Sequence, residues 1–229
     1  MLTPQSRSEL TTIIKAYVNK FCVFRCDPNK QYVPDLPRGT ISGKGGSPLK
    51  WQVYLRRLTH DSDMMAGVAM LMLDKMFRNG EVAENIQFAG METSSLPIIS
   101  FLQGWARNQN FHVNSYSVRK ERKSYGLFNV IDGKPNTNNF VVIDDITNSG
   151  TTINAVCDVS LYELDLSPAL NSYFILNLNP EKTYHVFNGY FINVNSILTL
   201  NDIMTEYQED LYWEPEDCQR IENYRPDYS

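Results

Sequence analysis

The chain is poor in the residues that build disulfide scaffolds and metal centres. Its 229 residues include four cysteines, which are scattered rather than paired: Cys22, Cys26, Cys157 and Cys218. This number and spacing exclude a disulfide-dense scaffold. Cys22 and Cys26 could contribute to a metal site, but no second ligand pair follows them, so buried thiols are the better interpretation. The three histidines form no ligand pattern and are expected on the surface or in hydrogen bonds: His60, His112 and His185.

Long apolar runs and excess positive charge are also absent. No run is long enough to span a membrane, and the first ten residues, MLTPQSRSEL, lack the apolar core of a signal peptide. We therefore expect a cytoplasmic protein without membrane contact. The formal net charge is −5, which does not favour general binding to nucleic acids. The length is sufficient for one α/β domain with a small appendage.

One stretch, FVVIDDITNSGTT at residues 140–152, combines features of a ligand site. Four apolar residues predict a strand buried on both faces, as in a parallel sheet, and Asp144 and Asp145 follow directly. Ligand sites of open α/β sheets lie at this end of the strands. The next residues offer hydroxyls and N–H groups at a helix N-terminus, which suits a phosphate. The stretch could therefore hold a sugar phosphate, although response regulators and metal-dependent phosphatases also carry apolar strands that end in Asp-Asp.

Strands and helices alternate on either side of this stretch, and this alternation predicts a mostly parallel sheet flanked by helices. The predicted strands are 86–89, 111–118, 140–143, 172–178 and 190–194, with a strand-like segment at 51–58. The predicted helices are about 8–21, one capped by Asp61 or Ser62 and ending at Asn79-Gly80, one with Pro97 near its first turn, 151–164, and one beginning near Leu200 with Thr199 or Asn201 as its cap.

A long polar loop separates two of the predicted strands. It runs from Val118 to Asn138 and opens with the basic cluster Arg119-Lys120-Glu121-Arg122-Lys123. A charged cluster is often only a solvated turn. A loop of this length inside a compact domain is usually functional, frequently as a lid. Its basic side chains could cover a pyrophosphate and exclude water.

Three segments together resemble the type I phosphoribosyltransferases. Residues 140–152 look like the family's motif for phosphoribosyl pyrophosphate (PRPP): an apolar strand, Asp-Asp, three residues, then hydroxyl–Gly–x–Thr. Residues 118–126, VRKERKSYG, look like the flexible catalytic loop of orotate phosphoribosyltransferases, Val-Arg-Lys-Glu-x-Lys-x-His-Gly, with Tyr125 in place of the histidine. Residues 88–97, FAGMETSSLP, resemble the pyrophosphate loop.

Two further segments fit the same order along the chain. Ser47-Pro48, before a segment ending in Leu55-Arg56, is similar to the N-terminal region of orotate phosphoribosyltransferases, and residues 194–203 resemble their closing segment. The resemblance implies the type I phosphoribosyltransferase (Rossmann-like) fold with a small N-terminal hood. The expected organisation is an N-terminal helix and hood at 1–60, a phosphoribosyltransferase core at 61–205, and an acidic aromatic tail at 206–229 that docks on the domain or on another subunit.

The resemblance also implies the substrates and the site. These are PRPP with Mg²⁺ and a nitrogenous base, with orotate favoured, in a homodimer whose flexible loop closes partly over the neighbouring subunit's site. The implied catalytic residues are Asp144, Asp145, Lys123, Lys120 and Arg119, with Tyr125 and Gly126 in the flexible loop. The 5′-phosphate is assigned to Asn148, Ser149, Gly150, Thr151 and Thr152, and the pyrophosphate to Gly90, Thr93, Ser94 and Ser95. Asp144 and Asp145 are assigned to the metal only indirectly, through substrate or water.

The sequence departs from the family pattern at several positions. Thr147 and Asn148 replace an aliphatic residue and a small residue or threonine, and Ser94 and Ser95 stand where bacterial enzymes often have Lys and Gly. No arginine follows the strand that ends in Leu176-Asn177-Leu178-Asn179, where relatives carry an Asp-Arg pair. Three hypotheses follow: an orotate phosphoribosyltransferase, a phosphoribosyltransferase for another base, or a non-catalytic nucleotide-binding protein with a regulatory or defence-associated role.

Overall fold

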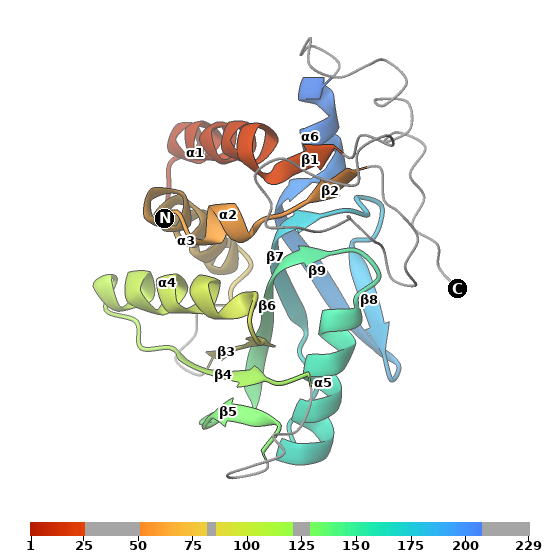
Figure 1. Cartoon of the computed structure of the whole chain (residues 1–229). Helices are drawn as coiled ribbons and strands as arrows, with labels where there is room; N and C mark the ends of the chain where they lie inside the picture. Colours follow the sequence, from red (N-terminus) through yellow and green to blue (C-terminus); the bar gives the residue numbers. More distant parts are fainter. Residues whose placement is uncertain (26–50, 82–85, 121–128, 208–229) are drawn as a thin grey trace.

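A seven-stranded sheet forms the centre of the molecule (Figure 1). The computed structural model describes residues 1–25, 51–81, 86–120 and 129–207. Within them the strand order is β5-β4-β3-β6-β7-β9-β8; the five inner strands are parallel, and β5 and β8 are antiparallel edges. The expectation of a mostly parallel sheet is confirmed. The strands are β3 (Ile86–Met91), β4 (Asn114–Val118), β5 (Ile131–Gly133), β6 (Asn139–Thr147), β7 (Asn171–Asn177), β8 (Tyr184–Phe187) and β9 (Tyr190–Thr199).

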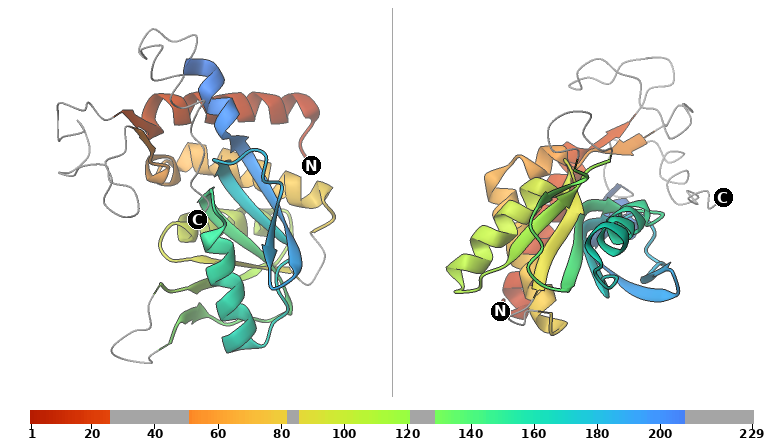
Figure 2. Two further views of the ribbon diagram at one scale, coloured as in Figure 1. Left: turned by 90° about the vertical axis from the view of Figure 1, so that its right-hand side faces the viewer. Right: turned by 90° about the horizontal axis from the view of Figure 1, so that it is seen from below.

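Helices cover both faces of this sheet. One face carries α1, α3 and α4, and the opposite face carries α5, as the view from below shows (Figure 2). The helices are α1 (Pro4–Tyr17), α2 (Arg56–Thr59), α3 (Ser62–Arg78), α4 (Ser95–Asn108), α5 (Thr151–Leu164) and α6 (Leu200–Tyr207), with a π-helical turn, η1 (Val18–Cys22), after α1. A separate antiparallel pair joins β1 (Val23–Arg25) to β2 (Trp51–Val53). None of the helices in the described segments is long and apolar enough to cross a membrane.

The apolar run of β6 is explained by this layering. Successive side chains of a strand point to opposite faces, so a strand covered on both faces needs apolar residues at every position. Val141 and Ile143 join the hydrophobic cluster beneath α3 and α4, whereas Phe140 and Val142 join the cluster beneath α5. All four side chains are buried, which fixes β6 as a central and rigid strand.

The ends of α3 follow from local chemistry. Asp61 caps its N-terminus by accepting hydrogen bonds from the backbone N–H groups of Asp63 and Met64. Its C-terminus is followed by Gly80 in the left-handed conformation, with φ of 76°. Three of its methionines lie in the core and confirm that this helix packs internally rather than presenting a binding face: Met65, Met72 and Met76.

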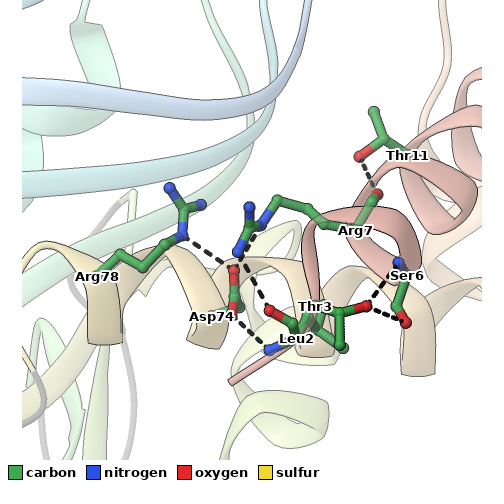
Figure 3. A network of polar contacts seen from close by, with 7 residues as sticks. All are labelled: Leu2, Thr3, Ser6, Arg7, Thr11, Asp74 and Arg78. Atoms are coloured by element: carbon green, nitrogen blue, oxygen red, sulfur yellow. Dashed lines mark hydrogen bonds and ion pairs between the residues drawn. The ribbon is translucent and has the colours of Figure 1, made fainter.

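A buried carboxylate attaches the first residues of the chain to α3 (Figure 3). Asp74 accepts hydrogen bonds from the backbone N–H of Leu2 at 2.7 Å, from Arg7 Nε at 2.8 Å and from Arg78 Nε at 3.0 Å. Burial by itself raises the pKa of Asp74, but these donors outweigh it and lower the pKa below its ordinary value. The N-terminal helix is therefore held against the core by a charged group that remains ionised.

Several predicted boundaries are wrong for identifiable reasons. The segment 51–58 is a strand only as far as Val53, and α2 begins at Arg56. Leu55 and Leu58 are both buried, and their spacing of three suits a helical turn rather than a strand. The strand predicted from Phe111 begins at Asn114, because the backbone N–H of Phe111 still bonds to Ala106 O and closes α4.

The other differences concern missing or short strands. The segment after Val118, which the sequence predicts as one long loop, contains the short strand β5. The last strand extends to Thr199 rather than ending at Val194, and β8, also not predicted, pairs with it through a turn at Asn188-Gly189. Both residues of that turn have positive φ, 47° and 84°, as tight hairpins of this kind require.

Candidate active site

The candidate site lies where the strand order of the sheet reverses. From β3 the chain crosses through α4 to β4 on one side, and from β6 it crosses through α5 to β7 on the other. The carboxyl ends of β3 and β6 are neighbours, with α4 and α5 on opposite faces. In open α/β sheets the ligand crevice lies outside the carboxyl ends of the strands at such a reversal. The two sequence motifs, residues 88–97 and 140–152, meet there.

Asp144 is the buried carboxylate of this crevice. Asp144 is only 4% exposed, and both oxygens of its side chain accept hydrogen bonds. Oδ1 accepts from Ser94 Oγ at 2.6 Å and from the backbone N–H of Asp145 at 3.0 Å, and Oδ2 accepts from Thr152 Oγ1 at 2.7 Å. Asp144 therefore ties together the loop after β3, the end of β6 and the first turn of α5.

Asp145 has a different environment. It is half-buried, and its Oδ1 accepts from the backbone N–H of Ile146 at 2.9 Å. Burial, and then the negative charge of Asp144, raise the pKa of Asp145 to about 7. Two adjacent carboxylates thus differ: Asp144 is an internal anchor, and Asp145 is the acid with a perturbed pKa, which is common at functional sites.

The residues assigned to the 5′-phosphate form the turn between β6 and α5. Gly150 is the N-cap of α5 and has a left-handed φ of 89°. The hydroxyls of Ser149 and Thr151 lie 2.7 Å apart, and both residues are exposed. The first N–H groups of a helix have no partner within the helix and bind anions. The hydroxyl of Thr152 donates to Asp144 Oδ2, so any part of Thr152 in binding a phosphate falls to its backbone N–H.

The segment between β7 and β9 packs against this turn. Lys182 Nζ donates a hydrogen bond to Ser149 O at 2.8 Å. His185 on β8 lies against Gly150, and its Nε2 is 2.6 Å from Asn154 Oδ1 in the first turns of α5. Neither Lys182 nor His185 was assigned to the site from sequence, because β8 itself was not predicted. The structure brings both to the turn.

The loop after β3 packs very closely against β6. A Cβ atom at Gly90 would lie 2.3 Å from Ser95 Oγ and 2.6 Å from Ile143 O, so glycine is required there. Ser95 is buried, and its hydroxyl donates to Met91 O at 2.6 Å. Thr93 is exposed, and the peptide between Glu92 and Thr93 is cis. Of the residues assigned to pyrophosphate, only Thr93 presents its side chain outward; Gly90 and Ser95 shape the loop.

Arg119 is held by two carboxylates at the end of β4. Its Nη1 lies 2.8 Å from Glu92 Oε2, and its Nη2 forms an ion pair with Asp132. The backbone reinforces this arrangement, because Glu92 N donates to Val118 O and Arg119 N donates to Val130 O. Arg119 therefore lies beside the loop after β3, and Lys120 is exposed next to it. The remaining flexible-loop residues, Lys123, Tyr125 and Gly126, lie outside the described residues.

The donors present fit an indirectly held Mg²⁺ rather than a protein cage. Among the described residues no cluster of three or more His, Cys, Asp or Glu side chains could enclose a metal. Both oxygens of Asp144 accept hydrogen bonds from protein groups, and Asp145 accepts one from the backbone N–H of Ile146. Mg²⁺ in phosphate sites is usually bound through one or two carboxylates, water and the phosphate itself. The indirect assignment of Asp144 and Asp145 to the metal stays a prediction.

Comparisons with known proteins give a consistent picture of the fold. No protein family model matches the sequence. The chain is 26% identical over 121 residues to an orotate phosphoribosyltransferase from Methanococcus maripaludis; the match covers 52% of this chain and 62% of that protein, less than two thirds of its length.

Solved structures resemble most of the chain. An orotate phosphoribosyltransferase from Aeropyrum pernix has a TM-score of 0.57 at 17% identity, covering 87% of this chain and 99% of that one. An adenine phosphoribosyltransferase from Saccharomyces cerevisiae has a TM-score of 0.54 at 13% identity, covering 83% and 99%. The chain has the type I phosphoribosyltransferase fold, and its sequence resembles the orotate phosphoribosyltransferases.

Proposed function

We propose that this protein is a phosphoribosyltransferase that transfers phosphoribose from PRPP to a nitrogenous base, with Mg²⁺ and with orotate as the favoured base. Orotate would give orotidine 5′-phosphate and pyrophosphate. One observation carries the proposal: adjacent carboxylates, Asp144 and Asp145, end β6 where the sheet reverses, and Asp144 joins Ser94 in the loop after β3 to Thr152 in the first turn of α5. Two loops joined through a carboxylate suit a sugar that carries phosphate groups at both ends.

The carboxylates would act on the ribose. The bond between C1 and the pyrophosphate oxygen breaks and its electron pair leaves with pyrophosphate, while a deprotonated ring nitrogen of the base supplies the electron pair of the new bond to C1. Positive charge develops on the sugar ring during this exchange. Asp145 would hold the ribose hydroxyls and steady that charge, and Asp144 would keep the surrounding loops in place.

The two ends of PRPP would be held by backbone and cations. The exposed hydroxyls of Ser149 and Thr151 and the N–H groups at the start of α5 would surround the 5′-phosphate. Thr93, with Arg119 and Lys120, would receive pyrophosphate, and we keep Lys123 in this role from its place in the sequence motif. Bound Mg²⁺ would neutralise charge on the pyrophosphate while Asp145 orients it through water or substrate.

The end of β7 favours a second candidate, a phosphoribosyltransferase for a base without a carboxylate. Asn177 is buried and occupied internally: its amide donates to Lys182 O and accepts from the backbone N–H of Asn179. An anionic base needs a cation or converging N–H donors, and no arginine follows this strand in the sequence. Asn148 Oδ1 is buried without a hydrogen-bond partner among the described residues, which suits a donor on a base. The third hypothesis, a non-catalytic nucleotide-binding protein, is supported by the same two features: the missing arginine and Asn148.

A single assay separates these functions. Purified protein is incubated with PRPP, Mg²⁺ and a panel of bases, and the release of pyrophosphate is followed, with Asp145→Asn as the inactive control. Release with orotate alone supports the first function, and release with another base supports the second. Binding of PRPP without turnover on any base supports the non-catalytic alternative. The proposed homodimer is tested separately by light scattering of the same preparation.

A further inference from the structure

His185 occupies the space that the side chain of any residue other than glycine would need at position 150. His185 is 7% exposed, on the edge strand β8. A Cβ atom built on Gly150 would lie 2.4 Å from His185 Nδ1 and 2.6 Å from its Cε1, closer than any ordinary contact. The imidazole therefore lies directly against the backbone at the N-cap of α5. The turn that precedes α5 is therefore packed against His185.

The same ring reaches into the first turns of α5. His185 Nε2 lies 2.6 Å from Asn154 Oδ1, and the backbone N–H of Asn154 donates to Gly150 O. Burial, followed by the positive charge of Lys182, lowers the pKa of His185, which favours the neutral imidazole. A neutral ring that donates from Nε2 to Asn154 leaves Nδ1 as the bare nitrogen, and Nδ1 has no hydrogen-bond partner among the described residues. The ring thus spans the N-cap and Asn154.

Lys182 contacts Ser149, the residue before Gly150. Its ammonium group donates to Ser149 O, which fixes the orientation of the peptide that leads into Gly150. A glycine in the left-handed conformation at a helix N-cap has more conformational freedom than other residues. Anion binding by backbone N–H groups depends on their pointing in one fixed direction. Lys182 and His185 together remove that freedom.

We infer that His185 is a positioning residue for the proposed phosphate loop, residues 148–152: it fixes Gly150 and the start of α5 in the anion-binding conformation, with Lys182 as a second support. The inference rests on the proposed function, because it names what organises the 5′-phosphate site. His185 does not touch the substrate. It acts on binding through the backbone of the loop.

The test measures three ligands by calorimetry in the presence of Mg²⁺: PRPP, ribose 5-phosphate and pyrophosphate. His185→Ala should weaken PRPP and ribose 5-phosphate in the same proportion, by about tenfold or more, because small displacements of binding groups have large effects. Pyrophosphate binding should stay unchanged, since its proposed site is the loop after β3. A general loss of structure would weaken all three ligands. Val186→Ala, a change at an exposed position on the same strand, is the matched control.

Two further variants keep the inference testable if His185→Ala folds poorly. Asn154→Ala removes the anchor of the ring without opening a cavity and should give a smaller loss, about threefold, for the same two ligands. Gly150→Ala should weaken them strongly, and the double variant with His185→Ala should recover part of that loss, because removal of the ring makes room for the new Cβ.

The outcomes distinguish this inference from the function on which it rests. If the unaltered protein binds neither PRPP nor ribose 5-phosphate, both the function and the inference are wrong. If it binds them and His185→Ala binds them equally well, only the inference is wrong. Equal weakening of pyrophosphate would also overturn it.

Discussion

Ser94 Oγ donates a hydrogen bond of 2.6 Å to Asp144 Oδ1, and this contact joins the loop after β3 to the end of β6 across fifty residues of sequence. Ser94 stands at a position where the resembling bacterial enzymes often carry lysine. Here its hydroxyl serves the buried carboxylate. The two loops proposed to hold opposite ends of PRPP are therefore mechanically connected through Asp144, which also accepts from Thr152 at the start of α5.

Loss of this contact should destabilise the protein. Ser94→Ala leaves Asp144 with fewer donors in a buried position, and a lost hydrogen bond to a charged group costs about 1.5–3 kcal/mol in the free energy of unfolding. Urea unfolding at pH 7 measures the difference. Ser100→Ala, at an exposed position on α4, is the control and should change stability by less than about 0.5 kcal/mol. Equal effects of the two substitutions would mean that the Ser94–Asp144 hydrogen bond contributes nothing to the free energy of unfolding.

The raised pKa of Asp145 predicts how stability depends on pH. The folded pKa is about 7 and the ordinary value is 3.8, so between these values the folded state keeps a proton that the unfolded state has released. The contribution of Asp145 to the free energy of unfolding therefore falls as the pH rises through this window, by at most about 1.4 kcal/mol per pH unit. Below about pH 4 both states are protonated, and the contribution is constant.

Asp145→Asn isolates this contribution. The amide carries no charge, so the variant should be more stable than the unaltered protein at pH 8 and should lose that advantage as the pH falls to about 4. The proposed function adds an opposite effect on activity, because turnover of PRPP should fall on the order of 10²-fold or more. Urea unfolding at a series of pH values, with turnover measured at pH 8, checks both. Parallel stability curves for the two proteins would show that the pKa of Asp145 is not raised.

Close packing at Gly90 gives a third prediction. Gly90→Ala places a methyl group 2.3 Å from Ser95 Oγ and 2.6 Å from the backbone oxygen of Ile143, which cannot move freely in a central strand. Overpacking of this kind costs about 1–3 kcal/mol. Gly104→Ala is the matched control: a Cβ there meets nothing within 4 Å, and alanine in the middle of α4 should stabilise the helix by about 0.5–1 kcal/mol. Chemical denaturation of both variants should give changes of opposite sign.

Much of this fold could be predicted because local patterns and tertiary structure agree. The run Phe140–Ile143 is apolar at every position and became a central parallel strand, and the helix after Gly150 begins and ends where its sequence predicted. Capping chemistry located α3 within a residue. The placement of Asp144 and Asp145 followed from the same argument, since acids that follow a buried strand reach the carboxyl edge of the sheet.

The supporting contacts of the site could not be predicted in the same way. Asn188-Gly189 is a hairpin signal that indicates β8, but no local pattern indicates that this strand brings His185 to Gly150. Asp144 and Asp145 differ in environment because it is Asp144 that accepts the hydrogen bond from Ser94, a residue fifty positions away in the sequence. Likewise, nothing local to Arg119 indicates that Glu92 and Asp132 would pair with it.

That pairing leads to the last prediction, which concerns Glu92. Its carboxylate lies 2.8 Å from Arg119 Nη1 and places a negative charge in the loop proposed to receive pyrophosphate. Glu92→Gln removes that charge and one competitor for Arg119, so pyrophosphate should bind roughly 2–5-fold more tightly, the range expected for a partly exposed ion pair. Calorimetric titration with pyrophosphate and Mg²⁺ measures the change, and the gain should shrink at high salt because exposed charges are screened. Ser100→Ala again serves as the neutral control. Weaker pyrophosphate binding by Glu92→Gln would indicate instead that Glu92 orients Arg119 toward the ligand, and that the two residues act together in binding rather than in competition.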